Sequence, residues 1–207
     1  MRSLDDHITS GTGQLQSLNE AREAGLVASR AVIRASASAI RAVHLRQPEV
    51  VARRLAEAAE ALTRAQAVLQ PHPVVYHAGF LHDAAKEYVE ARATAALVAG
   101  VDVPGPDELG VEIPAWLNGL AEAASELRRH ALDRLRDGEL DRSEALLGAM
   151  DDVFGALVAI DLPDAVTGGL RRTLDSLRAV IERTRGDITV AVLQERLRES
   201  IERHQSM

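Results

Sequence analysis

The sequence predicts an all-α protein, a bundle-like array of about seven helices. Along most of the chain, apolar residues recur at intervals of three, four and seven, which is the spacing of one helix face. No segment shows the alternation of apolar and polar residues that is typical of a half-buried strand. Aromatic residues make up only 2% of the chain, so Leu, Val, Ile and Ala must build the core. Such a composition favours closely packed helices.

The length of the chain favours one domain. Its 207 residues are enough for a substantial core and too few to expect two. The first residues, MRSLDDHITSGTG, lack the hydrophobic segment of a signal peptide, and no run of about eighteen apolar residues predicts a membrane span. We therefore expect a flexible tail over residues 1–12, a single domain over residues 13–207 and a cytoplasmic location.

The first predicted helix covers residues 15–46. Its apolar face carries residues seven apart, namely Leu26, Ile33 and Ile40. A second stripe on the same helix is basic and consists of Arg30, Arg34 and Arg41. No acidic partner follows four residues after each arginine, so the stripe is either a solvated face or a phosphate-binding surface.

Prolines and glycines mark the next boundaries. Pro48 suits the first position of a second helix that ends near Leu69. After Pro71-His72-Pro73 we expect a third helix over residues 75–99. Three prolines and three glycines in residues 100–114 predict the longest irregular connection, with one helical turn at Pro106–Leu109.

Four more helices are expected in the second half of the chain. One covers residues 114–136 and ends at Asp137-Gly138. Asp141, with Glu144 three residues later, predicts a capping box at the start of the next helix. After Leu162-Pro163-Asp164, two further helices are expected, separated by a break at Gly186-Asp187. Their apolar faces carry Leu170, Leu174, Leu177 and Ile181, then Val190, Leu193, Leu197 and Ile201.

Two pairs of carboxylates indicate a possible metal site. Glu87 and Glu90 are three residues apart, and Glu122 and Glu126 are four apart, so each pair shares a helix face. Asp83, four residues before Glu87, extends the first pair. If the two faces pack together, the like charges repel unless protons or a cation neutralise them. In proteins, a divalent cation usually neutralises such a group of carboxylates.

Spacing alone leaves the function open, because glutamate pairs also arise by chance on solvated helix faces. Metal sites bridged by carboxylates suit phosphodiester cleavage. Di-iron oxygenases of helical bundles instead need a Glu-x-x-His motif on each of two helices, and none of the four glutamates has a histidine three residues later. Ligation by histidine is not expected, because His72, His77 and His82 lack helical spacing.

The charge of the chain bears on its partners. The net charge of −7 argues, by itself, against a nucleic-acid-binding surface. Of the 24 basic residues only Lys86 is a lysine. This preference for arginine indicates either a GC-rich genome or bidentate contacts with phosphate. Cysteine is absent, which excludes disulfides and thiolate zinc sites.

An ordered set of motifs resembles the translin/TRAX family over residues 24–187. The motifs are Ile40-Arg41-Ala42-Val43-His44, Glu87-Tyr88-Val89-Glu90-Ala91, Trp116-Leu117-x-Gly119-Leu120, Ala124-Ser125-Glu126-Leu127-x-Arg129, the Asp137-Gly138 turn, and Leu170-Arg171-Arg172 through Arg183-x-Arg185-Gly186. One motif alone would be weak, but their order and spacing together make the resemblance specific.

The resemblance implies a seven-helix fold that assembles into a hollow octamer and binds single-stranded RNA or DNA inside it. In the eukaryotic complex the TRAX subunit is a metal-dependent endoribonuclease, whereas translin binds nucleic acid without the acidic site. Glu87, Glu90 and Glu126 match the TRAX metal ligands. Glu122 stands where TRAX has Asp, and Ser125 is the translin-like version of that position. Such a mixture fits a prokaryotic member that forms a homo-oligomer.

We therefore expect a metal-dependent endoribonuclease that acts on single-stranded RNA. Its expected ligands for one or two Mg²⁺ or Mn²⁺ ions are Glu87, Glu90, Glu122 and Glu126. Attack by water should leave a 5′-phosphate and a 3′-hydroxyl. Residues expected to guide the strand are Arg30, Arg34, Arg41, Arg128 and Arg129. Two alternatives are a single-stranded RNA- or DNA-binding protein without catalysis and a purely structural helical assembly.

Overall fold

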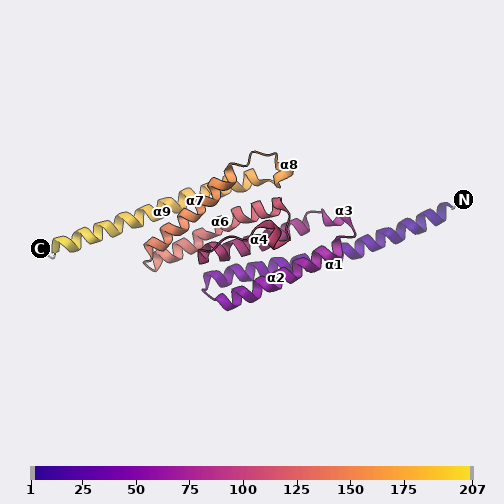
Figure 1. Ribbon diagram of the computed structural model, residues 1–207, viewed down its shortest axis with the longest axis horizontal. Helices are drawn as coiled ribbons and strands as arrows, with labels where there is room; N and C mark the ends of the chain where they lie inside the picture. Colours follow the sequence, from indigo (N-terminus) through magenta and orange to yellow (C-terminus); the bar gives the residue numbers. More distant parts are fainter. Residues whose placement is uncertain (1–2, 206–207) are drawn as a thin grey trace.

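Residues 3–205 are described in the computed structural model, and they form nine helices and no strand (Figure 1). Six helices are long: α1 (Leu4–His44), α2 (Pro48–Leu69), α4 (Phe80–Ala99), α6 (Ile113–Arg136), α7 (Leu140–Val158) and α9 (Leu170–Gln205). The other three are single turns: α3 (Pro73–Tyr76), α5 (Pro106–Leu109) and α8 (Asp164–Thr167). The prediction of an all-α fold is therefore confirmed.

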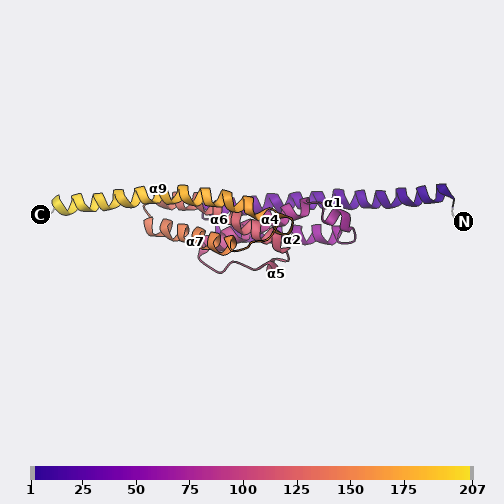
Figure 2. The same cartoon turned by 90° about the horizontal axis from the view of Figure 1, so that it is seen from above.

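The long helices lie side by side, with α4 and α6 in the middle of the array (Figures 1 and 2). On one side, α1 packs against α4, and α2 packs against α1. On the other side, α7 and α9 pack against α6 and against each other. The two helices that carry the predicted carboxylates are thus the central, neighbouring pair.

Two clusters of buried side chains fill this array. One lies among α1, α2 and α4, and the other is built mainly from α6, α7 and α9. Trp116 packs against both clusters, and its indole N–H donates a hydrogen bond of 2.9 Å to the carbonyl of Pro104. Leucine, valine, isoleucine and alanine dominate both clusters, as the scarcity of aromatic residues predicts.

A glycine sets the close approach of α4 and α6. A Cβ atom at Gly119 would lie 2.6 Å from the carbonyl oxygen of Lys86 and 2.7 Å from the Cβ of Val89. No side chain fits at these distances, so the backbones can approach this closely only because residue 119 is glycine. The contact brings Glu122, one turn after Gly119, next to the turn of α4 that begins at Lys86.

The two ends of the chain project from the array in opposite directions (Figures 1 and 2). A flexible tail is expected over residues 1–12, but Leu4 to Thr12 are the first turns of α1, which begin at a capping box between Ser3 and Asp6. Residues 1–2 lie outside the described part. Within residues 3–205, no helix is both long and apolar enough to cross a membrane.

Besides the earlier start of α1, three helix boundaries differ from the prediction. The expected third helix is divided into α3 and α4, because Gly79 adopts a φ of +95° that a helix cannot contain. Helix α7 starts at Leu140 with Glu139 as its N-cap and has no capping hydrogen bond, so the predicted capping box at Asp141 is wrong.

The predicted break at Gly186-Asp187 is also wrong, because α9 continues from Leu170 to Gln205. Thr184 and Ile188, on either side of this dipeptide, are buried, and the Asp187 carboxylate lies 2.9 Å from the Arg128 guanidinium. These contacts hold the helix together where a glycine costs roughly 1 kcal/mol in helix propensity.

Candidate metal centre

Three of the four predicted glutamates converge between α4 and α6. One carboxylate oxygen each from Glu87, Glu90 and Glu122 lies within 4.8 Å of the others. All three side chains are partly buried. Asp83, on the same helix as Glu87, is exposed and lies outside this trio. We call Glu87, Glu90 and Glu122 the acidic cluster.

Crowding of negative charge shifts the proton equilibria in the acidic cluster. Burial, followed by the charges of Glu87, Glu122 and Glu126, raises the pKa of Glu90 to about 8. Burial also raises the pKa of Glu87; the charge of Lys86 opposes this shift, whereas those of Glu122 and Asp83 reinforce it. In the absence of a cation, the cluster therefore retains a proton on Glu90 at neutral pH.

Lys86 contributes a positive charge to the acidic cluster. Its Nζ lies 2.7 Å from the Oε1 of Glu122, and the side chain is 24% exposed. Burial alone would lower the pKa of Lys86, but the hydrogen bond to Glu122 and the neighbouring carboxylates raise it. The ammonium is therefore charged and joins α4 to α6 at the cluster.

Glu126 is held by a histidine from a third helix. The Nε2 of His44, at the end of α1, lies 2.6 Å from the Oε1 of Glu126, and the His44 side chain is only 2% exposed. The buried Nδ1 atoms of His44 and His130 have no hydrogen-bond partner within the described residues. Burial, followed by the nearby His44, lowers the pKa of His130. Glu126 is thus oriented toward His44 beside the acidic cluster rather than inside it.

The five predicted strand-guiding arginines divide into two groups. Arg30, Arg34, Arg41 and Arg129 are exposed. Arg128 is engaged within the chain, because it hydrogen-bonds Thr184 and pairs with Asp187. At 3.6 residues per turn, the three arginines of α1 point within about a quarter turn of the direction of His44. The basic stripe of α1 therefore borders the side of the helix that faces Glu126.

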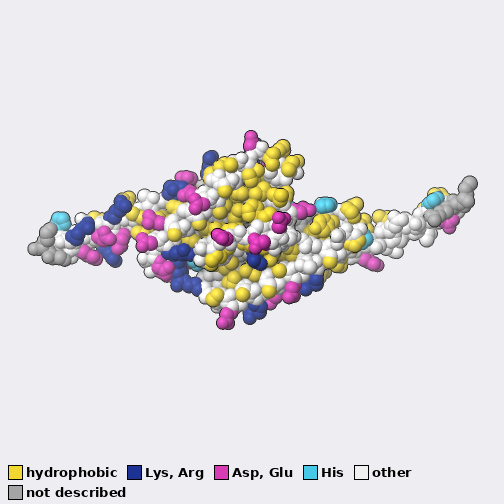
Figure 3. Space-filling view, in the orientation of Figure 1, with side chains coloured by type: hydrophobic (Ala, Val, Ile, Leu, Met, Phe, Trp, Pro, Cys, Tyr) yellow, Lys and Arg dark blue, Asp and Glu magenta, His cyan; other side chains and the backbone are white. Residues whose placement is uncertain are grey.

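Hydrophobic side chains are prominent on one face of the molecule (Figure 3). On the face seen in Figure 3, hydrophobic side chains gather over the middle of the molecule, with a few acidic and basic groups among them. The projecting end of α9 carries mixed charges, including the ion pairs of Arg198 with Glu195 and Glu202.

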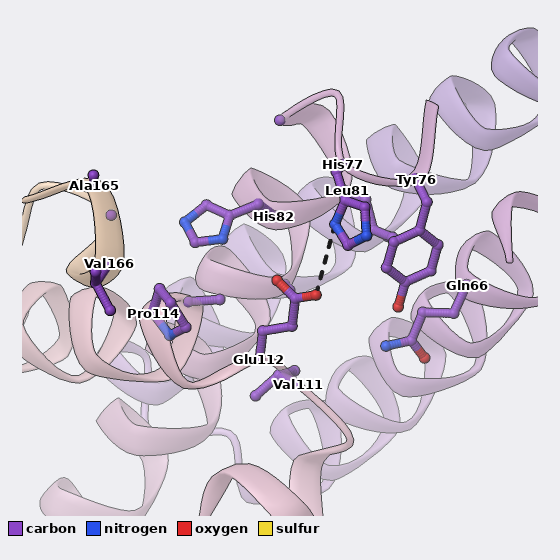
Figure 4. A pocket seen from close by; sticks show the side chains of 14 residues that line it. Gln66, Tyr76, His77, Leu81, His82, Val111, Glu112, Pro114, Ala165 and Val166 are labelled. Carbon is purple, nitrogen blue, oxygen red and sulfur yellow. Dashed lines mark ion pairs between the residues drawn. The ribbon is translucent and has the colours of Figure 1, made fainter. Parts of the chain in front are cut away.

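A pocket of about 300 Å³ lies near the first turns of α4 and α6. Figure 4 shows Tyr76 and His77 at one side of this pocket, Glu112 between His77 and His82, and the apolar Val166 at the far side. His77 Nδ1 and Glu112 Oε1 are 3.9 Å apart. None of these histidines belongs to the acidic cluster.

The donor set of the acidic cluster fits a hard divalent cation. Three carboxylates supply only oxygen, which Mg²⁺ and Mn²⁺ prefer. Burial, followed by the charges of the neighbouring carboxylates, raises the pKa of Glu90 even with the Lys86 ammonium nearby. A cation bound there would favour the ionised form of Glu90 over its protonated form.

Two partners of the cluster were not assigned a role from the sequence. Lys86 and His44 each reach a glutamate on another helix, so helical spacing could not pair them. Two sequence signals do mark them: Lys86 is the only lysine in the chain, and His44 ends the basic stripe of α1.

No family model matches the chain. Over 128 residues it is 30% identical to an uncharacterized protein of Methanocaldococcus jannaschii, a match that covers 61% of this chain and 57% of that protein. The chain thus spans less than two thirds of that relative.

Solved structures match over nearly the whole chain. The structure of an AfC3PO–duplex RNA complex has a TM-score of 0.85 and 32% identity, covering 91% of this chain and 97% of that chain. AfC3PO in another structure has a TM-score of 0.81 and 30% identity, covering 91% and 98%. Apo-NeC3PO, at 21% identity and a TM-score of 0.81 over 92% and 98%, is similar in fold alone.

Proposed function

Because this chain belongs to the translin-like family of the C3PO structures, we propose that it is a metal-dependent endoribonuclease that cleaves single-stranded RNA inside a hollow homo-oligomer, with an octamer favoured. The observation that carries the proposal is the acidic cluster, in which Glu87, Glu90 and Glu122 converge between α4 and α6. The similarity to a structure that holds RNA supports RNA as the substrate class.

In this proposal some residues of the site bind the cation, and others hold those ligands in position. Glu87, Glu90 and Glu122 would bind Mg²⁺ or Mn²⁺, and a carboxylate oxygen of Glu126 would complete the set. A divalent cation supplies Lewis acidity and lowers the pKa of a bound water. His44 fixes the orientation of Glu126 through the 2.6 Å hydrogen bond. Support of this kind holds a metal ligand in place.

Hydrolysis by water defines the products. The oxygen of water forms a bond to phosphorus, the bond from phosphorus to the 3′-oxygen breaks, and the 3′-oxygen takes up a proton. The products are a 5′-phosphate and a 3′-hydroxyl. A 2′,3′-cyclic phosphate would instead require attack by the ribose 2′-hydroxyl, for which four carboxylates that bind a cation are not needed.

The path of the strand follows from the charge distribution. Arg30, Arg34 and Arg41 are exposed along α1 on the side of His44, and Arg129 is exposed on α6. Guanidinium groups in these positions would contact phosphates on either side of the cleaved bond. Arg128 has a weaker case, because its guanidinium already pairs with Asp187.

The direct test is cleavage of an end-labelled RNA by the purified full chain. Mg²⁺, Mn²⁺ and EDTA are compared on single-stranded and duplex RNA, since a similar structure contains duplex RNA. Glu87→Ala and Glu122→Ala should each abolish cleavage. Glu60→Ala is the matched control, because Glu60 is 73% exposed on α2 and pairs only with Arg64 within the described residues. Chromatography of the products identifies their ends.

The alternative, a protein that binds single-stranded RNA or DNA without cleaving it, makes a different prediction. RNA would be retained in EDTA and in Mn²⁺ alike, and the two alanine variants would bind as tightly as the wild type. In that case the glutamates of the acidic cluster would have no catalytic role.

A further inference from the structure

Lys86 lies inside the candidate metal centre, not at its edge. It precedes Glu87 on α4 and reaches across to α6, where its ammonium lies 2.7 Å from Glu122. Its side chain is 24% exposed, and that of Glu122 is 32% exposed, so the pair is partly withdrawn from water. The attraction within such a pair is screened less by water and salt than that of a fully exposed pair.

The choice of lysine at this position is informative. Every other basic residue of the chain is arginine. The guanidinium of arginine is a planar fork that pairs with a carboxylate through two donors, whereas the ammonium of lysine is a compact point charge. The Lys86 ammonium contacts one oxygen of Glu122, Oε1, whereas a bidentate guanidinium would occupy both oxygens of that carboxylate. The only lysine of the chain thus places a compact positive charge beside the acidic cluster.

The charges of the acidic cluster and Lys86 favour one divalent ion. The acidic cluster gathers one oxygen from each of three glutamates, while Glu126 already uses an oxygen for His44. Two-ion sites hold their ions roughly 4 Å apart, and carboxylates bridge them. In this site the Lys86 ammonium already places one positive charge beside Glu122. The three negative charges of the cluster are matched by one divalent ion and one ammonium.

We propose that Lys86 is the second cation of the site: Glu87, Glu90 and Glu122, with Glu126 completing the set, hold a single divalent ion, and the Lys86 ammonium takes the place of another. This inference rests on the proposed ribonuclease function. One of the three N–H groups of Lys86 is directed at Glu122, and the other two are available to phosphate oxygens. Lys86 therefore stabilises negative charge that develops on the phosphoryl group during cleavage.

Metal binding without RNA tests the first part. Full-length protein freed of metal with EDTA is titrated with Mn²⁺ and followed by calorimetry and by electron paramagnetic resonance. The wild type should bind one Mn²⁺ per chain. Lys86→Met, which keeps the length of the side chain and removes its charge, should bind Mn²⁺ about tenfold more tightly, because a positive neighbour is lost.

Cleavage at saturating Mn²⁺ tests the second part. Lys86→Met should cleave RNA about 100-fold more slowly than the wild type, the loss typical of removing one group that stabilises transition-state charge. Lys86→Arg should recover part of this rate, since it restores the charge with a different shape. Arg92→Met is the matched control, because Arg92 lies on α4 away from the cluster and contacts Tyr88. Circular dichroism checks that each variant is folded.

Two results would overturn the proposal. One is a wild-type protein that binds two Mn²⁺ ions per chain. The other is a folded Lys86→Met variant with wild-type Mn²⁺ affinity and wild-type cleavage. If the wild type binds one Mn²⁺, Lys86→Met binds it more tightly and neither protein cleaves RNA, the ribonuclease function fails, while Lys86 as the second cation of the site is supported.

Discussion

His44 and Glu126 join the end of the first helix to the centre of the molecule through a hydrogen bond of 2.6 Å between Nε2 and Oε1. They are 82 residues apart in sequence, and the His44 side chain is almost completely buried. The contact therefore ties α1 to α6 at the point where Glu126 approaches the acidic cluster.

His44→Ala should weaken both the fold and the metal centre. The substitution leaves a partly buried carboxylate without its partner, which costs about 1–3 kcal/mol of unfolding free energy. Loss of a residue that orients a ligand should lower Mn²⁺ affinity about 10- to 100-fold. Urea denaturation and Mn²⁺ titration measure the two effects. His7→Ala, at an exposed position on the same helix, should change neither.

Glu90 predicts how the metal-free protein responds to pH. Its pKa is raised from 4.5 in the unfolded chain to about 8 in the fold, so the folded state holds an extra proton between these values. The stabilisation linked to this proton is full below about pH 4.5 and is lost as pH rises through 8. In EDTA, the melting temperature should therefore fall between pH 6 and pH 9, and Glu90→Gln should flatten this decline.

The same proton should leave when metal binds. At pH 6.5, Mn²⁺ binding should release about one proton, because a cation ligand must be ionised. Calorimetry in buffers of different ionisation enthalpy counts the released protons. Release that stays constant between pH 6.5 and pH 9.5 would contradict the assignment of the raised pKa to a ligand of the metal.

Gly119→Ala should separate α4 from α6. The added methyl group would lie 2.6 Å from the backbone oxygen of Lys86, and overpacking of this kind typically costs about 1–3 kcal/mol. Mn²⁺ affinity should fall with stability, since the three glutamates come from both helices. Gly148→Ala is the control: residue 148 is exposed on α7 with open space around it, so alanine there should stabilise the protein by roughly 0.5–1 kcal/mol.

Arg41→Gln should weaken RNA binding without changing the metal centre. If Arg41 contacts one phosphate, the slope of log affinity against log salt should fall by about 1. Fluorescence anisotropy of a labelled single-stranded RNA in EDTA measures binding without cleavage. Arg64→Gln, on α2 and paired with Glu60, serves as the control. Equal slopes in both variants would remove Arg41 from the strand path.

The sequence predicts a helix boundary well where local residue spacing determines it, and poorly where packing against other helices determines it. The long helices follow from apolar spacing, which is a local property. The division at Gly79 and the continuity through Gly186 do not, because a positive φ and the burial of Ile188 are set by packing against other helices. Gly79 therefore interrupts a predicted helix, whereas Gly186 lies within a continuous one.

The candidate site divides in the same way. The spacing of the glutamates places them on helix faces, and the family resemblance selects these faces. Spacing along one helix cannot predict which side chains pair between helices. The contacts of Lys86 and His44 with glutamates are therefore seen only once α1, α4 and α6 are packed together. The exposed state of Asp83, which spacing groups with Glu87, also depends on that packing.

A single lysine has a practical consequence for the chemistry used to handle this protein. Reagents that acylate amines have one side-chain target in the whole chain, and it lies in the candidate metal centre. Where biotin esters, amine-coupled sensor chips and lysine crosslinkers react with a side chain rather than with the N-terminal amine, they would therefore modify the site that they are meant to report on. Conversely, the extent of acetylation of this one side chain, read by mass spectrometry, would monitor occupancy of the site in an unlabelled sample.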